Sequence, residues 1–209
     1  MADIKRLWRI YPQNSALKQR LSEALGVSPA LAQVLINRGL TDKDEARAFL
    51  QGGQECLLDP WLLKDMAKAV SKIEQAIAKG KQITIYGDYD VDGVTASALL
   101  YMFLQRLGAQ VNYYIPERQS EGYGLNFQAL ESLLRSGTGL LITVDCGISA
   151  IEEIDYFRQK MDIIITDHHQ PPPQLPPAYA ILNPKQPGCA YPNKELAGVG
   201  VAFKLCQAL

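Results

Sequence analysis

Cysteine is scarce in this chain of 209 residues, and the four present show neither close pairing nor zinc-ligand spacing: Cys56, Cys146, Cys189 and Cys206. This argues against a disulfide framework and indicates small buried side chains in a reducing cytoplasm. Long apolar runs are also missing. No segment approaches the roughly 20 apolar residues of a membrane span, and the N-terminus has no apolar signal-peptide core. The sequence therefore indicates neither secretion nor membrane insertion.

An excess of charge of either sign is missing as well. The net charge of −1 provides no global attraction to nucleic acid. With 47% hydrophobic and 21% charged residues, the composition is that of an ordinary soluble globular protein. The length is sufficient for one α/β domain and a small appendage.

The pattern of the chain changes near residue 80. Residues 1–80 have the apolar spacing of helices, including one long helix expected from Pro60 to Lys79, and they carry no cluster of reactive side chains. From residue 81, β-rich runs alternate with helical segments. We expect strands at 83–86, 111–115, 140–144, 163–166 and 178–182. The prediction is an N-terminal helical segment (1–80) and an α/β domain (81–209) with a mostly parallel sheet and helices on both faces.

Three polar clusters each follow directly after a predicted strand. Because the carboxyl ends of parallel strands lie along one edge of a sheet, these clusters should meet in space. They contain Asp88, Asp90 and Asp92, then Asp145, then Asp167-His168-His169.

So many carboxylates in one crevice would repel each other without cations. Carboxylate oxygens with imidazole nitrogens suit Mn²⁺, and carboxylate-rich ligation suits Mg²⁺. A single ion would leave most of these groups unpaired. Two ions roughly 3.5–4 Å apart would use them all and would activate water against a phosphoester.

Simpler interpretations of the clusters are weaker. An EF-hand calcium loop starting at Asp88 would need Glu at its twelfth position, where the chain has Leu99. Asp92 alone could be just the N-cap of its helix, but the other two clusters argue for function. His168 and His169 are the only histidines in the chain, and they are adjacent after a strand. Functional use of both is therefore favoured.

These clusters resemble the motifs of the DHH phosphoesterase superfamily, which is named for the run present here as Asp167-His168-His169. The first two motifs correspond to residues 86–93 and 144–147. Residues 196–205 follow the third motif at the expected distance. Other segments are similar to the RecJ family of bacterial single-strand-specific 5′→3′ DNA exonucleases: 35–40, 46–50, 58–60, 63–66, 115–118, 121–124 and 182–185. The resemblance covers essentially the whole chain.

The resemblance implies a role for each site residue. Asp90, Asp92, Asp145 and His168 match the metal ligands, with Asp145 as the bridge, and Asp88 is a ligand or a close partner of one. His169 matches the residue that meets the scissile phosphate, and Asp167 orients its neighbours. Weaker candidates for contacts with the DNA strand are Arg118, Tyr123 and Asn126. Their presence in a solvent-exposed loop without function would explain these polar residues equally well.

Two departures from the family pattern matter. Some members of the superfamily have histidine where this chain has Tyr86, so Asp88 is expected to fill that ligand position. The last metal-binding aspartate of the family lies downstream of Leu209, which implies a fragment truncated at its C-terminal end. Weak metal binding and little or no processive activity are therefore expected of the isolated chain.

The hypothesis that follows is the N-terminal catalytic part of an exonuclease of DNA repair and recombination. It would release 5′-mononucleotides with two Mn²⁺ or Mg²⁺ ions. Its implied partners are single-stranded DNA, a single-strand-binding protein and a helicase, with no membrane. A DHH-family oligoribonuclease or cyclic-dinucleotide phosphodiesterase is the first alternative, and the RecJ-like helical front argues against it. A non-catalytic DNA-binding relative is the second, and the intact acidic and histidine set argues against that.

Overall fold

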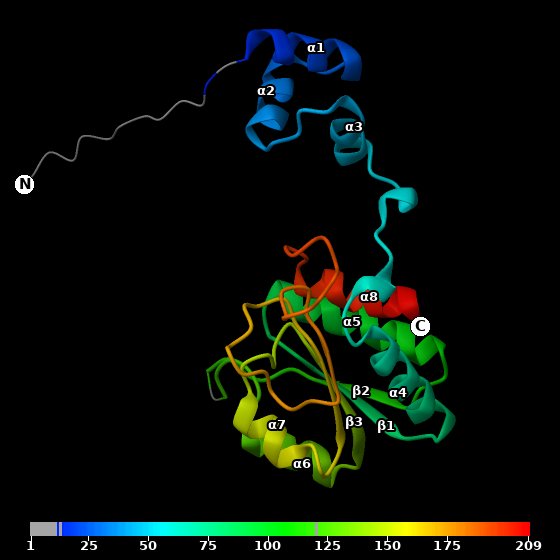
Figure 1. Ribbon diagram of the computed structural model, residues 1–209. Helices are drawn as coiled ribbons and strands as arrows, with labels where there is room; N and C mark the ends of the chain where they lie inside the picture. The colour runs from blue at the N-terminus through cyan, green and yellow to red at the C-terminus, as the bar shows by residue number, and fades with distance from the viewer. Residues whose placement is uncertain (1–11, 13, 120) are drawn as a thin grey trace, which may run out of the picture. The chain divides into compact units, whose positions relative to one another are not determined.

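The computed structural model describes residues 12, 14–119 and 121–209 and divides them into two compact units at the Leu58–Asp59 bond (Figure 1). The first unit contains α1 (Ser15–Leu25), α2 (Pro29–Asn37), α3 (Lys43–Gln51) and the short 3-10 helix η1 (Gln54–Cys56). Asn14, Ser28 and Asp42 begin its three α-helices by accepting hydrogen bonds from first-turn N–H groups. Its small core consists of Leu21, Ala32, Leu35 and Ala46.

The second unit is a five-stranded sheet between two layers of helices. Every neighbouring pair of strands is parallel, and the strand order is β2-β1-β3-β4-β5. This confirms the predicted α/β class with a parallel sheet. In chain order the unit consists of η2 (Pro60–Leu62), α4 (Met66–Ala78), β1 (Gln82–Gly87), α5 (Val91–Arg106), β2 (Val111–Tyr114), α6 (Phe127–Arg135), β3 (Thr138–Val144), α7 (Ile151–Phe157), β4 (Asp162–Thr166), β5 (Ala180–Leu182) and α8 (Gly198–Ala208).

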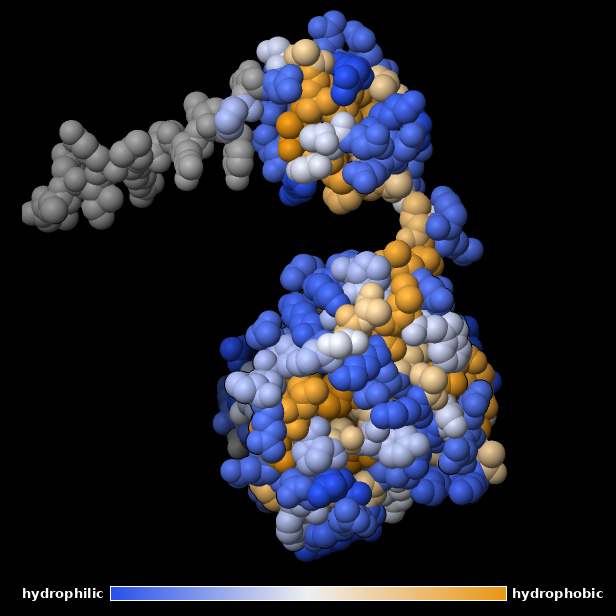
Figure 2. Space-filling model, viewed as in Figure 1, coloured by the Kyte–Doolittle hydropathy of each residue, from blue (hydrophilic) through white to orange (hydrophobic). Residues whose placement is uncertain are grey.

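Each face of the sheet has its own hydrophobic core. Helices α4, α5 and α8 cover one face, and α6 and α7 cover the other (Figure 1). The β3 strand is buried along almost its whole length, as expected for a parallel strand covered on both faces. The surface that faces the viewer in Figure 2 is mostly hydrophilic, with apolar side chains in smaller patches. None of the described helices has the length and apolar character needed to cross a bilayer.

The region around residue 60 differs from the sequence-based expectation. The long helix expected from Pro60 is interrupted, because Asp65 adopts a left-handed backbone conformation (φ 63°) and α4 begins only at Met66. Ala69, Val70 and Ile73 on α4 are buried in the same core as the sheet. The predicted boundary between residues 80 and 81 therefore lies inside the second compact unit.

The strand order places a topological switch between β1 and β3. From β1 the chain passes to β2 on one side, and the later strands are added on the other side. The connections after β1 and β3 therefore diverge at the carboxyl end of the sheet. In open α/β sheets, ligands bind at such a switch point.

Candidate metal and phosphoester site

The turn after β1 carries the first acidic cluster. Asp88 is buried, and its Oδ1 accepts the N–H of Tyr89 at 2.8 Å. Asp90 is the N-cap of α5, since its Oδ1 accepts the N–H groups of Asp92 (2.8 Å) and Gly93 (3.0 Å). The alternative in which Asp92 is this cap is therefore wrong. Asp92 lies in the first turn of the helix, with its carboxylate directed elsewhere.

The carboxylate of Asp92 lies against the start of α8. Its Oδ2 accepts the N–H of Gly198 at 2.7 Å, and its Oδ1 accepts the N–H of Val199 at 2.6 Å. The same Oδ2 is 3.6 Å from Nε2 of His168. Asp92 therefore connects the first cluster, the histidines and a helix far along the chain.

Asp145 lies at the centre of the site. It follows β3, its backbone is left-handed (φ 61°) and only 1% of its surface is exposed. Burial, together with the charges of Asp92 and Asp90, raises its pKa to about 7. Its Oδ1 is buried without a hydrogen-bond partner among the described residues, although Nε2 of His168 is 3.1 Å away. A buried carboxylate oxygen with no partner is costly, and a bound cation would satisfy it.

Asp167 organises the histidine pair. Its Oδ1 accepts the backbone N–H groups of His168 (2.7 Å) and His169 (3.1 Å) and the Nδ1–H of the His169 ring (2.7 Å). Its Oδ2 accepts the N–H of Ile148 at 3.0 Å. Burial alone would raise the pKa of Asp167, but the hydrogen bonds from His169 and Ile148 outweigh burial and lower it. The hydrogen bond to Asp167 in turn raises the pKa of His169.

Two groups of possible metal ligands share Asp145. Asp88, Asp90 and Asp145 form one group, and Asp145, His168 and His169 form the other. Within each group, one potential ligand atom per residue lies within 4.8 Å of the others. The donor set and the partnerless oxygen of Asp145 fit two divalent cations that share this carboxylate.

The loop after β2 brings Tyr123 to the histidines. The Tyr123 hydroxyl is 3.4 Å from Nδ1 of His169 and 3.5 Å from the carbonyl oxygen of Asp145. Arg118 is exposed, with its guanidinium 5.3 Å from the ring centre of Tyr89. The carboxyl end of the sheet, with its three clusters of aspartates and histidines, is called the acidic edge below. Tyr123 and Arg118 both lie beside this acidic edge, where a substrate could reach them.

Asn126, the third candidate in this loop, is engaged within the protein. Its Oδ1 caps α6 through the N–H of Ala129 (2.7 Å), and its Nδ2 donates to the hydroxyl of Tyr86 (3.3 Å). Contact between Asn126 and a DNA strand stays a prediction. The Tyr86 hydroxyl donates to the carbonyl of Gly124 at 3.0 Å, so Tyr86 anchors this loop.

Sequence reasoning missed two residues that contact the site. Asn183 is fully buried after β5, and its Nδ2 donates to the carbonyl oxygen of His169 at 2.9 Å. Its position directly after a strand was an available signal. Gly198 meets both Asp92 and Asp145, and nothing local in the sequence indicates this.

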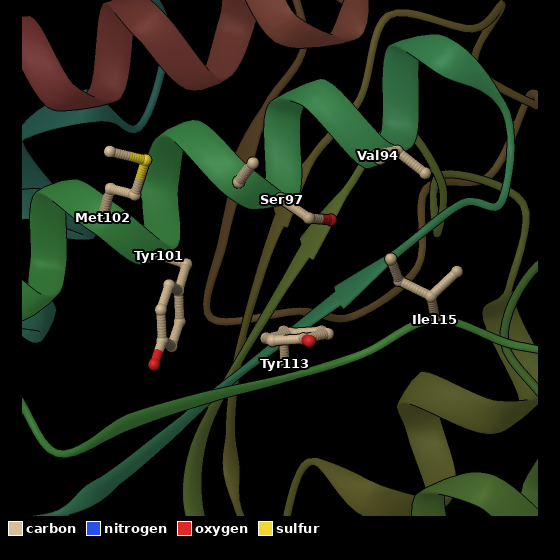
Figure 3. A pocket seen from close by; sticks show the side chains of 7 residues that line it. Val94, Ser97, Tyr101, Met102, Tyr113 and Ile115 are labelled. Carbon is tan, nitrogen blue, oxygen red and sulfur yellow. The ribbon is translucent and has the colours of Figure 1, made fainter.

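A separate hollow between α5 and β2 has a different character (Figure 3). The cavity has a volume of about 290 Å³, and its lining includes Val94, Tyr101 and Met102 of α5 together with Tyr113 and Ile115. None of its lining side chains is charged, so it lacks the ligands that a divalent cation needs. The chemistry of the clusters belongs to the acidic edge of the sheet.

Comparison with known proteins points in one direction. Residues 82–209 match the N-terminal domain of the DHH family. The single-stranded-DNA-specific exonuclease RecJ of Bacillus subtilis is 48% identical over 206 residues, covering 98% of this chain and 26% of that protein. The RecJ of Escherichia coli is 37% identical over 184 residues, covering 87% of this chain and 31% of that protein.

A solved structure gives the same result. The crystal structure of Thermus thermophilus RecJ in complex with Mn²⁺ matches with a TM-score of 0.72 and 31% identity, covering 94% of this chain and 27% of that one. The chain thus spans about a quarter to a third of the length of these relatives.

Proposed function

Because the chain belongs to the DHH family, we propose that its acidic edge holds two divalent cations, Mn²⁺ or Mg²⁺, and hydrolyses single-stranded DNA from the 5′ end to 5′-mononucleotides. The RecJ relatives are single-stranded-DNA-specific exonucleases, and one was solved with Mn²⁺. The observation that carries the proposal is Asp145. Its Oδ1 is buried and accepts no hydrogen bond from the part of the chain that the structure describes, and Asp145 belongs to both ligand groups.

In this proposal the ligands divide around Asp145. Asp88, Asp90 and Asp145 hold one cation, while Asp145 and His168 hold the other with the help of Asp92, which lies 3.6 Å from His168. When bound, such cations lower the pKa of water and neutralise charge on the phosphate. Because its pKa is raised to about 7, Asp145 is partly protonated near neutral pH in the metal-free protein, and it would lose this proton when a cation binds.

His169 donates a hydrogen bond to the scissile phosphate in this proposal. Its Nδ1–H is occupied by Asp167, so Nε2 is the nitrogen that can face the substrate. The raised pKa of His169 favours the imidazolium, in which Nε2 carries a proton. A positioned donor of this kind stabilises the charge that develops on phosphate oxygens.

The loop after β2 supplies substrate contacts. Arg118 pairs with a backbone phosphate, and Tyr123, held beside His169, stacks on a base or donates to a phosphate. Asn126 contributes by capping α6 and bonding Tyr86, which keeps this loop in place.

In this proposal the protein acts in the cytoplasm. The four free cysteines support this location, because thiols stay reduced there. A single strand must be separated from its complement and kept open before hydrolysis. A helicase and a single-strand-binding protein are therefore the partners that we propose.

The test is hydrolysis of a 5′-phosphorylated, 3′-labelled single strand with Mn²⁺, in this chain and in a version extended to the length of its relatives. Asp145→Asn should abolish release of 5′-mononucleotides. Asp155→Asn, which changes an exposed aspartate of α7 that is paired with Arg158, should leave release unchanged. A double-stranded DNA substrate should not be hydrolysed. If the protein hydrolysed cyclic dinucleotides but released no 5′-mononucleotides from single-stranded DNA, the exonuclease proposal would be wrong and a cyclic-dinucleotide phosphodiesterase would take its place.

A further inference from the structure

The N-terminus of α8 lies against the acidic edge and is capped by a residue from another helix. Ala197, the N-cap of α8, makes no side-chain cap. The carboxylate of Asp92 from α5 takes that role, accepting the N–H groups of Gly198 and Val199 at 2.7 and 2.6 Å. The unsatisfied N–H groups and the positive end of the helix dipole both favour a carboxylate there.

Gly198 also lies tightly against Asp145. A methyl group added at position 198 would be 2.6 Å from Oδ1 of Asp145 and 2.8 Å from its Cβ and Cγ. Atoms do not approach so closely without a shift. Gly198 is not among the glycines with a positive φ, so its backbone conformation is open to any residue. Glycine is therefore needed at this position for space.

Neither side of this contact can retreat easily. Asp145 is buried in a left-handed backbone conformation, and its Oδ1 is also 3.1 Å from Nε2 of His168. Helix α8 is held by Val201, Ala202 and Leu205, which are buried in the same core as Leu100 and Leu104 of α5. A larger residue at position 198 must displace Asp145 or pull the helix away from Asp92.

We infer that Gly198 is a positioning residue of the metal centre, where one backbone position sets the carboxylates of both Asp92 and Asp145. Its N–H holds Asp92, and its missing side chain makes room for Asp145. The start of α8 thus acts as a backbone support for two ligands that come from α5 and from the turn after β3. This inference rests on the proposed function, in that it assigns the acidic edge to cations.

The test compares two alanine substitutions in the first turn of α8. Gly198→Ala introduces the clash with Asp145. Gly200→Ala is the matched control, since a methyl there would meet only the flexible Leu196 side chain, at 3.2 Å. Mn²⁺ affinity is measured from the electron paramagnetic resonance signal of the free ion. We expect affinity to fall about tenfold or more in Gly198→Ala, the range typical of residues that orient metal ligands, and to stay within about threefold in Gly200→Ala.

A second measurement needs no variant. In nuclear magnetic resonance spectra of the wild-type protein, the amide signals of Gly198 and Val199 should shift when Mg²⁺ is added, because their acceptor is Asp92. This measurement decides the matter if Gly198→Ala does not fold. Equal Mn²⁺ affinity in the two folded variants, or unmoved amide signals at saturating Mg²⁺, would overturn the inference. A wild-type protein that binds no Mn²⁺ would instead overturn the proposed function and this inference with it.

Discussion

The ring of His169 donates its Nδ1–H to Oδ1 of Asp167 across 2.7 Å, and the same oxygen accepts the backbone N–H groups of both histidines. One carboxylate oxygen therefore fixes the orientation of the imidazole and the turn on which it is carried.

Asp167→Asn should destabilise the metal-free protein by about 1–3 kcal/mol, because it weakens several buried hydrogen bonds at once. The effect should depend on pH. The pKa of His169 is raised above its usual 6.5 by the hydrogen bond to Asp167. This hydrogen bond therefore stabilises the fold fully below pH 6.5, and its contribution is lost as pH rises through the pKa of His169 in the folded protein. The pKa of Asp167 is lowered from 3.8, so its contribution is present above that pH and is lost in stronger acid.

Urea unfolding of Asp167→Asn and wild type in EDTA should therefore show the largest difference between about pH 4 and 6.5. The matched change of an exposed aspartate, Asp155→Asn, should cost about 0–1 kcal/mol. A difference between wild type and Asp167→Asn that is constant from pH 4 to 8 would contradict the assigned pairing.

Mn²⁺ binding should release a proton from Asp145. Burial and the neighbouring carboxylates raise the pKa of Asp145 to about 7, so a cation must displace that proton below this pH. Calorimetric titration should find that apparent affinity rises by up to about tenfold per pH unit below 7 and levels off above. An affinity independent of pH between 5.5 and 7.5 would show that Asp145 is already ionised without metal.

Asp145→Asn is the control for this titration. Because its folded pKa lies above the unfolded value of 3.8, Asp145 costs stability in the metal-free protein as pH rises toward and through 7. At pH 8 without metal, the variant should be more stable than wild type by on the order of 2 kcal/mol, while the increase in Tm on adding Mn²⁺ should be lost.

Tyr86→Phe should loosen the loop that carries Arg118 and Tyr123. It removes the buried hydroxyl that donates to Gly124 and accepts from Asn126, which should cost about 1–2 kcal/mol. Hydrogen exchange at Gly124 and its neighbours should accelerate. Tyr113→Phe is the control, since that side chain is largely exposed on the adjacent strand. Unchanged exchange in Tyr86→Phe would mean that the loop is held by other contacts.

Gly93→Ala should disrupt the first acidic turn. A methyl group at position 93 would lie 2.5 Å from the carbonyl oxygen of Asp88, and this backbone cannot move without shifting the acidic turn itself. We expect a loss of about 2–3 kcal/mol in the free energy of unfolding. Gly139→Ala should be tolerated better, since its methyl would meet only the Lys81 side chain, at 3.3 Å. Similar costs at the two positions in thermal unfolding would refute the argument from backbone crowding.

Local patterning was enough to predict the class of the fold and the edge where the clusters meet. Apolar β-rich runs followed by Asp88, Asp145 and Asp167 indicate strands that end in polar turns, and parallel pairing then places those turns together. The predicted parallel sheet with helices on both faces is confirmed. These features depend on residues close to one another in the chain, so the sequence carries them directly.

The sequence alone determined which side chains could do the chemistry, and tertiary structure decided how they are supported. Strand order, which periodicity does not encode, placed the topological switch between β1 and β3. The contacts of Asp92 with Gly198 and of Asn183 with His169 join segments on different elements. The break at Asp65 likewise depends on packing, because the core that holds α4 forms only when distant strands pair. Such contacts have no local signal, since their partners become neighbours only after the sheet and its helices have assembled.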